Sequence, residues 1–410
     1  AKENFGRHNI LEQQKMGGQE STMKLRDEQE PKSFDDISSA GTPSTSSPQF
    51  ASTDMLYAAA SVPELRSNPI RPKELLRNLR KYHKETVRLP ASDTQWAKQL
   101  VYSHTQKLLE FCKRETGVVR NMEYTGSMYE RLETKKNNEF EVMVVLTTGS
   151  EDVSVEEVVP GLYTKLKLNT EQADTKLVKF TDNFDYLRPD KMRNLLDKVA
   201  QTWTESSKRF SDGTRVRTHK HGTAVEMIIR DTNRGGSVTA QLVPCVKIED
   251  DAGMSRYFVP CAFQEYTKFE LENNTERAIL WRKSFSLRER ELLSSLDRSG
   301  STCRTECLKV LKFLFNSDRK LRPFHFHMLK TAFLHYHSLD QDWRSDQLGE
   351  RFLGMLRYIR ECITKKDLPH YFVPRVNLMK VLSVSSRNSI GARLQQLLTN
   401  EKQLFYAISG

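Results

Sequence analysis

The spacing of apolar residues changes character near Trp281, and this change constrains the fold more than any other feature of the chain. Before Trp281, alternating apolar and polar residues predict strands with helical patterns between them. The predicted strands cover residues 139–146, 223–229 and 236–246. After Trp281, apolar residues recur every three or four positions over residues 307–315, 326–336 and 348–363. We therefore expect an α+β chain whose first lobe contains a mixed sheet and whose second lobe is helical.

Two helices are expected ahead of the first strand. Pro72 opens a pattern in which leucines share one face and basic residues cover the rest, and proline suits the first position of a helix. A second, longer helix is expected to begin at Ser92, because Ser92 and Gln95 have the spacing of a capping box. Its predicted buried stripe contains Trp96, Leu100, Leu108 and Cys112.

The first 60 or so residues lack any periodic apolar pattern, and residues 33–53 are rich in Ser, Thr, Pro and Gly. Such a segment buries too little apolar surface to offset the entropy lost on ordering. We predict a disordered tail over residues 1–62, a core lobe with the long helix over 63–280, and a helical lobe over 281–410.

The chain has a net charge of +11, which favours polyanionic partners because basic side chains near phosphates release condensed counterions. Arg77, Arg80 and Lys81 lie on the basic face of the first helix and are candidate nucleic-acid contacts, although such charges can also form a merely solvated surface. No run of about 18 apolar residues predicts a membrane span. Six scattered cysteines are typical of a reduced intracellular protein, so we expect a cytoplasmic location, with or without a nuclear fraction.

A Gly-Ser turn followed by two glutamates is the segment best suited to chemistry. In Thr125-Gly126-Ser127, glycine allows the backbone to approach a phosphate and serine offers a hydroxyl. Glu139 and Glu141 are two positions apart on one predicted strand and therefore project to the same side. Paired carboxylates of this kind hold Mg²⁺ for phosphoryl transfer. The alternative interpretation is a solvated face of a half-buried strand.

These residues resemble the cyclic GMP-AMP synthase family and its Mab-type relatives. Residues 125–130 followed by 138–143 are similar to the activation segment and the paired acids of that family, with the same spacing. Further matches follow in order, at residues 281–286, 307–309, 330–335, 342–343, 348–349 and 371–374. The resemblance covers the chain from about Pro72 onward. It implies a bilobal nucleotidyltransferase fold with a mixed-sheet lobe, a long N-terminal spine helix and a helical C-terminal lobe.

The resemblance also implies an activity. Double-stranded nucleic acid, either DNA or RNA, would bind across the long helix at Lys98, and the enzyme would join ATP and GTP into a cyclic dinucleotide as an innate immune sensor. Glu139 and Glu141 would ligate Mg²⁺ or Mn²⁺. The implied nucleotide contacts are Thr125, Gly126, Ser127, Arg282 and Lys312. A homodimer is compatible with the family.

Three departures from the family's pattern bear on that activity. Gln241 stands where the third acid is expected, so the site loses one of three anions, and Glu226 on a neighbouring strand is the acid considered as a replacement. Glu141 stands where active members have Asp. The loop before residue 307 supplies only Cys303, with Cys307 starting the helix, and two thiols do not complete a tetrahedral site. We therefore expect no zinc there.

Three functions remain open on the sequence. The chain is either an active cyclic dinucleotide synthase or a catalytically inactive nucleotide- or nucleic-acid-binding adaptor of the same fold, a pseudoenzyme like the related mitochondrial fission adaptors. A nucleic-acid-binding module in which only the basic helix matters is a third possibility. The histidines show no recognised metal-site spacing, so we expect no metal at His221, His325, His327, His335 or His337.

Overall fold

A computed structural model describes residues 71–136, 138–171, 173–206, 213–249, 252–261, 278–297, 302–339 and 342–409. These residues all belong to one compact unit. The predicted disordered tail lies outside the described residues. In the described part of the chain, no helix combines the length and the apolar character that crossing a membrane requires.

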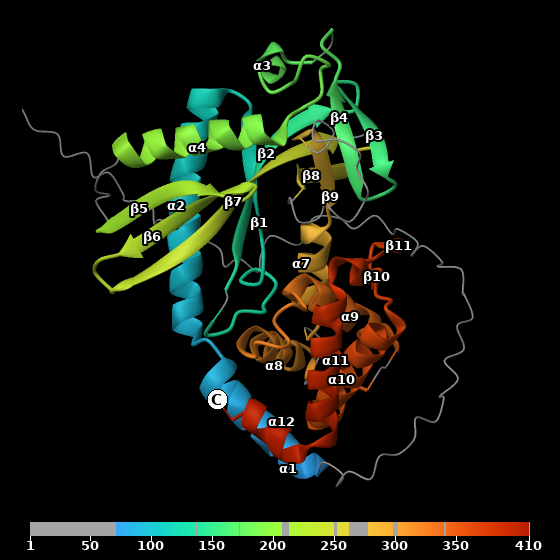
Figure 1. Cartoon of the computed structure of the whole chain (residues 1–410). Coiled ribbons are helices and arrows are strands. Elements are labelled where there is room, and N and C mark those ends of the chain that lie inside the picture. Colours follow the sequence, from blue (N-terminus) through green and yellow to red (C-terminus); the bar gives the residue numbers. More distant parts are fainter. Residues whose placement is uncertain are drawn as a thin grey trace, which may run out of the picture. The chain divides into compact units, whose positions relative to one another are not determined.

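The described chain begins with two helices joined by a short π-helical turn (Figure 1). Helix α1 (Pro72–Tyr82) has proline at its first position and buries Leu75, Leu79 and Tyr82, as predicted. The turn η1 (His83–Val87) leads to the 26-residue helix α2 (Ala91–Thr116). The long helix before the first strand is therefore present.

The start of α2 differs from the prediction, because the capping box at Ser92 and Gln95 does not form. The helix begins one residue earlier, directly after Pro90, and no side chain caps it. Instead, the Pro90 carbonyl accepts hydrogen bonds from the Thr94 backbone N–H at 3.0 Å and from the Thr94 hydroxyl at 3.2 Å. Because proline holds its backbone in one conformation, the first turn is organised without a serine cap.

The first lobe is built on a mixed sheet of nine strands. Strands β2 and β7 run parallel, and the other pairs are antiparallel. The order is β1-β2-β7-β8-β9-β4-β3, and β6 and then β5 extend the sheet beside the first half of β7. The strands are β1 (Val119–Thr125), β2 (Phe140–Gly149), β3 (Val153–Val159), β4 (Tyr163–Leu168), β5 (Thr214–His221), β6 (Ala224–Asp231), β7 (Gly236–Glu249), β8 (Ser255–Pro260) and β9 (Leu280–Ser284).

Strand β2 is buried on both faces, and the expectation of a half-buried strand was wrong. On one face, Val142 and Val144 pack in a cluster with α2 and α4 (Pro189–Ser206). On the other face, Met143 and Val145 are fully buried in a second cluster. These two clusters cover both faces of the strand, and β1 and β7 pair with its two edges. Figure 1 shows α2 and α4 crossing behind and above these strands.

The second lobe is helical, as predicted. Its helices are α7 (Ser286–Ser294), α8 (Arg304–Ser317), α9 (Phe326–Leu339), α10 (Leu348–Lys365), α11 (Val384–Thr399) and α12 (Glu401–Ala407). The remaining short elements are α3 (Thr175–Val178), η2 (Ser345–Gln347), β10 (Pro369–His370), β11 (Val373–Asn377) and η3 (Leu378–Val381). Leu348, Phe352, Leu356 and Ile359 of α10 are all fully buried in the core of this lobe.

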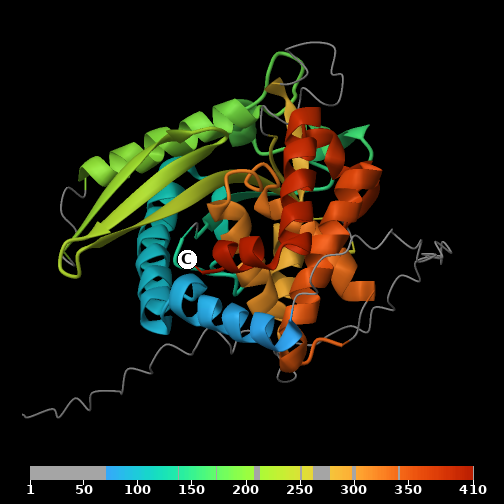
Figure 2. The ribbon, with the colours of Figure 1, turned by 60° about the horizontal axis from the view of Figure 1, so that its bottom comes forward.

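Helix α1 packs against the helical core although it precedes the sheet in the sequence. Leu75 and Leu79 belong to the same apolar cluster as α10. The backbone N–H of Arg71 donates to Glu401 at 3.2 Å, which joins α1 to α12. Figures 1 and 2 both show these two helices side by side. The boundaries predicted at residues 63 and 281 remain predictions.

Candidate functional site

The turn between β1 and β2 brings the Gly-Ser pair against the first acid. Gly126 has φ +88°, a conformation that side chains other than glycine rarely adopt. A Cβ atom on Gly126 would lie 2.7 Å from the Glu139 carbonyl oxygen, so this close approach requires glycine. The Ser127 hydroxyl accepts a hydrogen bond from the Glu139 backbone N–H at 3.0 Å. The turn is therefore tied directly to the residue that precedes β2.

The two hydroxyls predicted to serve a phosphate are buried in this arrangement. Thr125 donates to the Glu141 carbonyl at 3.4 Å, and Ser127 already accepts from Glu139. A hydroxyl can accept one hydrogen bond while donating another, so the Ser127 hydroxyl remains able to donate its proton. The structure brings Thr125, Gly126 and Ser127 next to the acids, and their phosphate contacts remain a prediction.

A row of polar residues crosses five strands on one face of the sheet. Glu141 of β2 lies opposite Thr125 of β1 and opposite Gln241 of β7. Gln241 lies opposite Glu226 of β6, and Glu226 lies opposite His219 of β5. Residues directly opposite on neighbouring strands present their side chains on the same face. The expected third-acid position therefore lies between two glutamates.

Gln241 binds the neighbouring acid on its outer side. Its Nε2 atom donates to Glu226 Oε2 at 2.8 Å, which leaves the amide oxygen as the atom able to coordinate a cation. Glu226 lies one strand further from Glu141 than Gln241 does. Glu226 is thus adjacent to the third-acid position at Gln241, but it does not occupy that position.

The two candidate metal ligands differ in exposure. Glu139 is exposed and directly precedes β2, one residue outside the strand on which it was expected, whereas Glu141 is partly buried within β2. Burial raises the pKa of the Glu141 carboxyl, Arg282 and Lys330 lower it, and Glu139 raises it further. These four charges therefore lie within electrostatic reach of one another. A cation bound there would favour the ionised carboxylates.

Four basic side chains of the helical lobe hold residues 124–133, the segment that carries the Gly-Ser turn. Their contacts are Arg290 with the Tyr124 carbonyl at 2.6 Å, Lys309 with Glu133 at 2.9 Å, Lys312 with the Leu132 carbonyl at 3.2 Å and Lys330 with Glu130 at 2.8 Å. The turn beside the acids is thus positioned by the second lobe.

Lys330 forms a buried triad with Glu130 and Glu289 that the sequence reasoning did not identify. Burial lowers the pKa of Lys330, but the two carboxylates outweigh it and the net pKa is raised. Lys330 in turn holds the pKa of Glu289 below its ordinary value, although burial opposes this. The partners are 41 and 200 positions away in the sequence, so no local pattern indicates the triad.

Lys312, a predicted nucleotide contact, is also buried. Burial lowers the pKa of its ammonium group to about 8, while Glu139 and Glu130 oppose this shift. Its Nζ atom is bound to the Leu132 carbonyl, so in this arrangement the charge supports the 124–133 segment. Arg282, the other predicted basic contact, lies on β9. The nucleotide contacts of both residues remain predictions.

The predicted nucleic-acid contacts lie on two successive helices. Arg77 and Lys81 are exposed on α1, whereas Arg80 donates to the Ser345 carbonyl at 3.0 Å. Lys98 of α2 lies over the ring of Tyr129, 5.8 Å from its centroid. Lys98 therefore connects the long helix to the segment that carries the Gly-Ser turn.

Three histidines of the helical lobe have partners within the fold. His335 Nε2 lies 2.9 Å from the Pro369 carbonyl, His337 accepts from Arg304 at 3.3 Å, and His327 lies 3.7 Å from Glu289.

The thiols of the loop before α8 are buried. Burial raises the pKa of Cys303 to about 12 and raises the pKa of Cys307 well above its ordinary value. Both shifts disfavour the thiolate form that binds zinc.

Comparison with known proteins gives two family matches and several relatives. Residues 128–295 match the Mab-21 protein nucleotidyltransferase domain, and residues 303–396 match the Mab-21 protein HhH/H2TH-like domain. The chain is 29% identical to "Cyclic GMP-AMP synthase-like receptor 3" of Stylophora pistillata over 80% of its own length and 96% of that protein. It is 26% identical to "Cyclic GMP-AMP synthase" of Sus scrofa, over 62% of this chain and 57% of that one.

Two further relatives match smaller shares of their own length. A "Cyclic GMP-AMP synthase-like receptor" of Magallana gigas is 22% identical over 75% of this chain and 56% of that protein. A mitochondrial dynamics protein of Xenopus laevis is 31% identical over 29% of this chain and 26% of that one. The chain thus spans little more than half of the pig and oyster proteins. The two domain matches, together with these relatives, show that this chain is a cyclic GMP-AMP synthase-like protein of the Mab-21 family.

Proposed function

We propose that the protein is a nucleotidyltransferase that joins ATP and GTP into a cyclic dinucleotide when double-stranded DNA or RNA binds, as an innate immune sensor of the cytoplasm or nucleus. One observation carries the proposal. The Gly126–Ser127 turn is bonded to Glu139, and Glu141 lies in register with the third-acid position at Gln241. A turn that admits a phosphate beside paired carboxylates is the arrangement that nucleotidyl transfer needs.

The donor set fits a hard divalent cation. Nucleotidyltransferases of this family generally use a divalent metal, and we propose Mg²⁺ or Mn²⁺. Glu139, Glu141 and the amide oxygen of Gln241 would hold it, because carboxylate and carbonyl oxygens are the ligands that such ions prefer. Once bound, it would supply charge stabilisation for the attacking and leaving oxygens. The set is one negative charge short of a three-acid site, so we expect weaker metal binding than in such a site.

The protein's own groups would perform the remaining tasks. Gly126 would let the backbone reach a triphosphate, with Ser127 and Thr125 as donors. Arg282 and Lys312 would offset the negative charge of the nucleotide. Since Lys312 and Lys330 hold the 124–133 segment from the second lobe, these contacts would keep the turn in place beside the acids.

A direct test is an assay of the purified full chain with radiolabelled ATP and GTP, Mg²⁺ or Mn²⁺, and double-stranded DNA or RNA. The parent is expected to form a cyclic dinucleotide, and Gln241→Asp is expected to form it faster, because the third anion is restored. Glu361→Gln on α10 is a matched control and should leave the rate unchanged. Absence of product from both the parent and Gln241→Asp would contradict the proposal.

A second candidate is a catalytically inactive adaptor that binds nucleotide or nucleic acid. The observation that favours it is the neutral Gln241, whose amide is bound to Glu226. Product from Gln241→Asp but not from the parent would select this candidate. Nucleic-acid binding without nucleotide binding would select a module that uses only its basic surface.

A further inference from the structure

Among the residues that the structure describes, one group of three metal-ligating side chains comes together: His219, His221 and Glu226. One ligand atom from each lies within 4.8 Å of the others. His219 and His221 alternate along β5 and therefore project to the same side. Glu226 lies opposite His219 on β6. The expectation of no metal at His221 rested on sequence spacing, which does not show that the pairing of β5 with β6 brings Glu226 next to the two histidines.

The two oxygens of Glu226 face different partners. Oε1 lies 3.3 Å from His219 Nε2, and Oε2 accepts the hydrogen bond from Gln241 at 2.8 Å. Metal-ligating carboxylates are commonly oriented by an outer hydrogen bond of this kind. Gln241 therefore holds Glu226 with one oxygen directed toward the histidines, whereas an acid at position 241 would repel it.

The group is accessible and of suitable chemistry. His219 and His221 are exposed and Glu226 is partly buried, so an ion can enter from solvent. Imidazole nitrogens combined with a carboxylate oxygen suit zinc and neighbouring transition metals. Bonds of 2.0 to 2.1 Å in tetrahedral geometry place donor atoms roughly 3.3 Å apart, so the side chains need to contract by at most about 1.5 Å.

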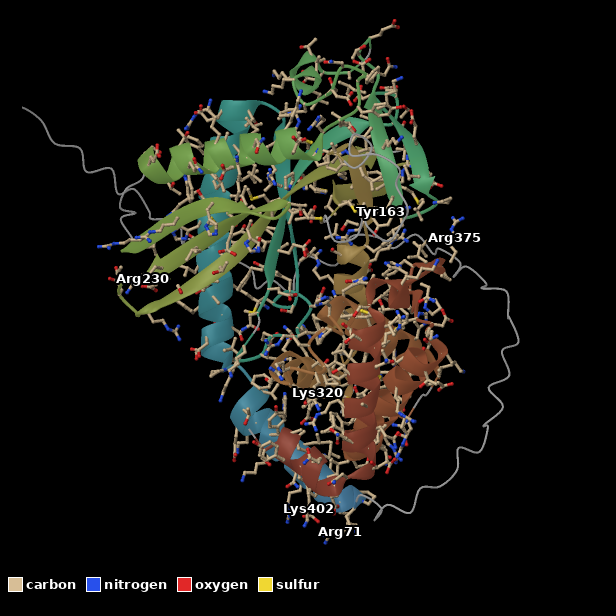
Figure 3. All side chains as sticks on the ribbon, viewed as in Figure 1. Arg71, Tyr163, Arg230, Lys320, Arg375 and Lys402 are labelled. Carbon is tan, nitrogen blue, oxygen red and sulfur yellow. The ribbon has the colours of Figure 1, made fainter. Side chains whose placement is uncertain are left out.

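Two basic residues of β5 lie near the group, and only Arg217 shares the face of His219 and His221. Lys220 lies between the two histidines in sequence and therefore projects to the opposite face, where its ammonium group is 3.6 Å from Asp197 of α4. Strand β5 is the outer strand of its side of the sheet and pairs with β6 (Figure 1). Arg230 of β6, labelled in Figure 3, lies toward the opposite end of this hairpin from Glu226.

We propose that His219, His221 and Glu226 form a three-residue site for a divalent transition-metal ion of the zinc type, with Gln241 as the residue that positions Glu226. Three protein ligands leave one coordination position open to solvent or to an anion. A bound ion would join β5 to β6 at the edge of the sheet. This proposal is independent of nucleotidyl transfer, because its readout is metal binding.

The test uses the full chain without a polyhistidine tag, titrated with Zn²⁺ by calorimetry and with Co²⁺ by visible absorption. The parent is expected to bind one ion per chain with the intense absorption of four-coordinate cobalt, apart from any ion that Glu139 and Glu141 hold. His219→Gln and His221→Gln should each lose more affinity than the about 10- to 100-fold expected for Gln241→Leu, which removes only the positioning hydrogen bond. His325→Gln, an exposed histidine of the other lobe, is the matched control and should bind like the parent.

Thermal unfolding provides an independent readout of the same site. Zn²⁺ should raise the melting temperature of the parent and of His325→Gln, but not that of His221→Gln, while all three should melt together in EDTA. If a histidine variant fails to fold, Glu226→Gln tests the third ligand in the same way. Binding that is absent from the parent, or unchanged in His219→Gln and His221→Gln, would overturn the proposal whatever the transferase assay shows.

Discussion

Gly126 shows how a single residue can determine the geometry of the candidate site. Two properties require glycine at this position. Its φ is positive, and a Cβ atom would lie only 2.7 Å from the Glu139 carbonyl oxygen. A glycine elsewhere in the chain can have the first property without the second. Gly235, with φ +74°, has open space where its Cβ would be. Comparing the two positions separates the cost of the φ angle from the cost of the close contact.

Gly126→Ala is therefore expected to lose more stability than Gly235→Ala. Both variants adopt an unfavourable φ, at a cost of about 1 kcal/mol or more, but only Gly126→Ala must also displace the Glu139 backbone. Urea unfolding of both variants measures the difference, and triphosphate binding should fall only in Gly126→Ala. Equal losses of unfolding free energy at the two positions would show that the close contact with Glu139 adds no cost of its own.

Lys312 leads to a prediction about pH, because burial lowers its pKa to about 8. In the unfolded chain the ordinary value is near 10.5, so between about pH 8 and 10.5 the unfolded state binds more protons. The stability of the parent relative to Lys312→Met should therefore rise with pH across this window, by up to about 3 kcal/mol. Over the same range, nucleotide affinity of the parent should fall as the ammonium charge is lost.

The Lys312 prediction can be checked by urea unfolding of both proteins at pH 7 and pH 9.5. A difference in unfolding free energy that does not change between these pH values would mean that the Lys312 ammonium group titrates normally.

At the scale of elements, the helices and strands were largely predictable and their register was not. Apolar spacing located β6, β7 and the helices α8, α9 and α10 of the second lobe, because burial imposes that spacing on each element separately. The start of α2 was placed wrongly because Pro90 organises the first turn without the expected cap. Glu141 and Gln241 are 100 positions apart, and only the parallel pairing of β2 with β7 places them side by side.

The site residues that were not predicted also depend on how elements pair and pack, which the sequence does not show. His219 and Glu226 belong to neighbouring strands of one hairpin, so the alternation of His219 and His221 on a strand was the available signal. The Lys330 triad had no such signal, because its members come from the β1–β2 segment, α7 and α9. Strand pairing within the hairpin sets the first arrangement, and packing between distant elements sets the triad.

The triad that joins these elements predicts a large effect of one substitution. Lys330→Met leaves Glu130 and Glu289 buried without their shared cation, and breaking a buried ion pair costs about 3 to 5 kcal/mol. Lys365→Met on α10 removes an exposed ion pair with Glu361 and should cost less than about 1 kcal/mol. Urea unfolding measures the loss of unfolding free energy in each variant. Similar losses in the two variants would show that the buried triad does not stabilise the fold more than an exposed ion pair does.

At the scale of the whole molecule, the basic residues of α1 and α2 form a surface whose binding to nucleic acid can be tested. The logarithm of the affinity for double-stranded DNA falls as the logarithm of the salt concentration rises, by about 0.9 per phosphate contact. Neutralising Arg77, Arg80, Lys81 and Lys98 together should make this negative slope shallower by up to about 3.6. Arg80 also holds Ser345, so its variant needs a check of folding.

A matched control for the basic surface neutralises Lys365, Lys366, Arg375 and Lys380, which are exposed on the helical lobe; Figure 3 labels Arg375 there. This control should keep the slope of the parent. Equal slopes for the parent and the α1–α2 variant would exclude those side chains as contacts.

The activity of the acids beside the Gly-Ser turn is the claim on which the rest of the functional account depends. Its most direct measurement is the rate at which labelled ATP and GTP form a cyclic dinucleotide in the parent and in Glu141→Gln, with Mg²⁺ or Mn²⁺ and double-stranded nucleic acid present. We expect product from the parent and at least a 100-fold slower reaction in the variant, since an electrostatic contact of this kind contributes about 10²–10³ to the rate. Equal rates in the two proteins, or no product from the parent, would contradict it.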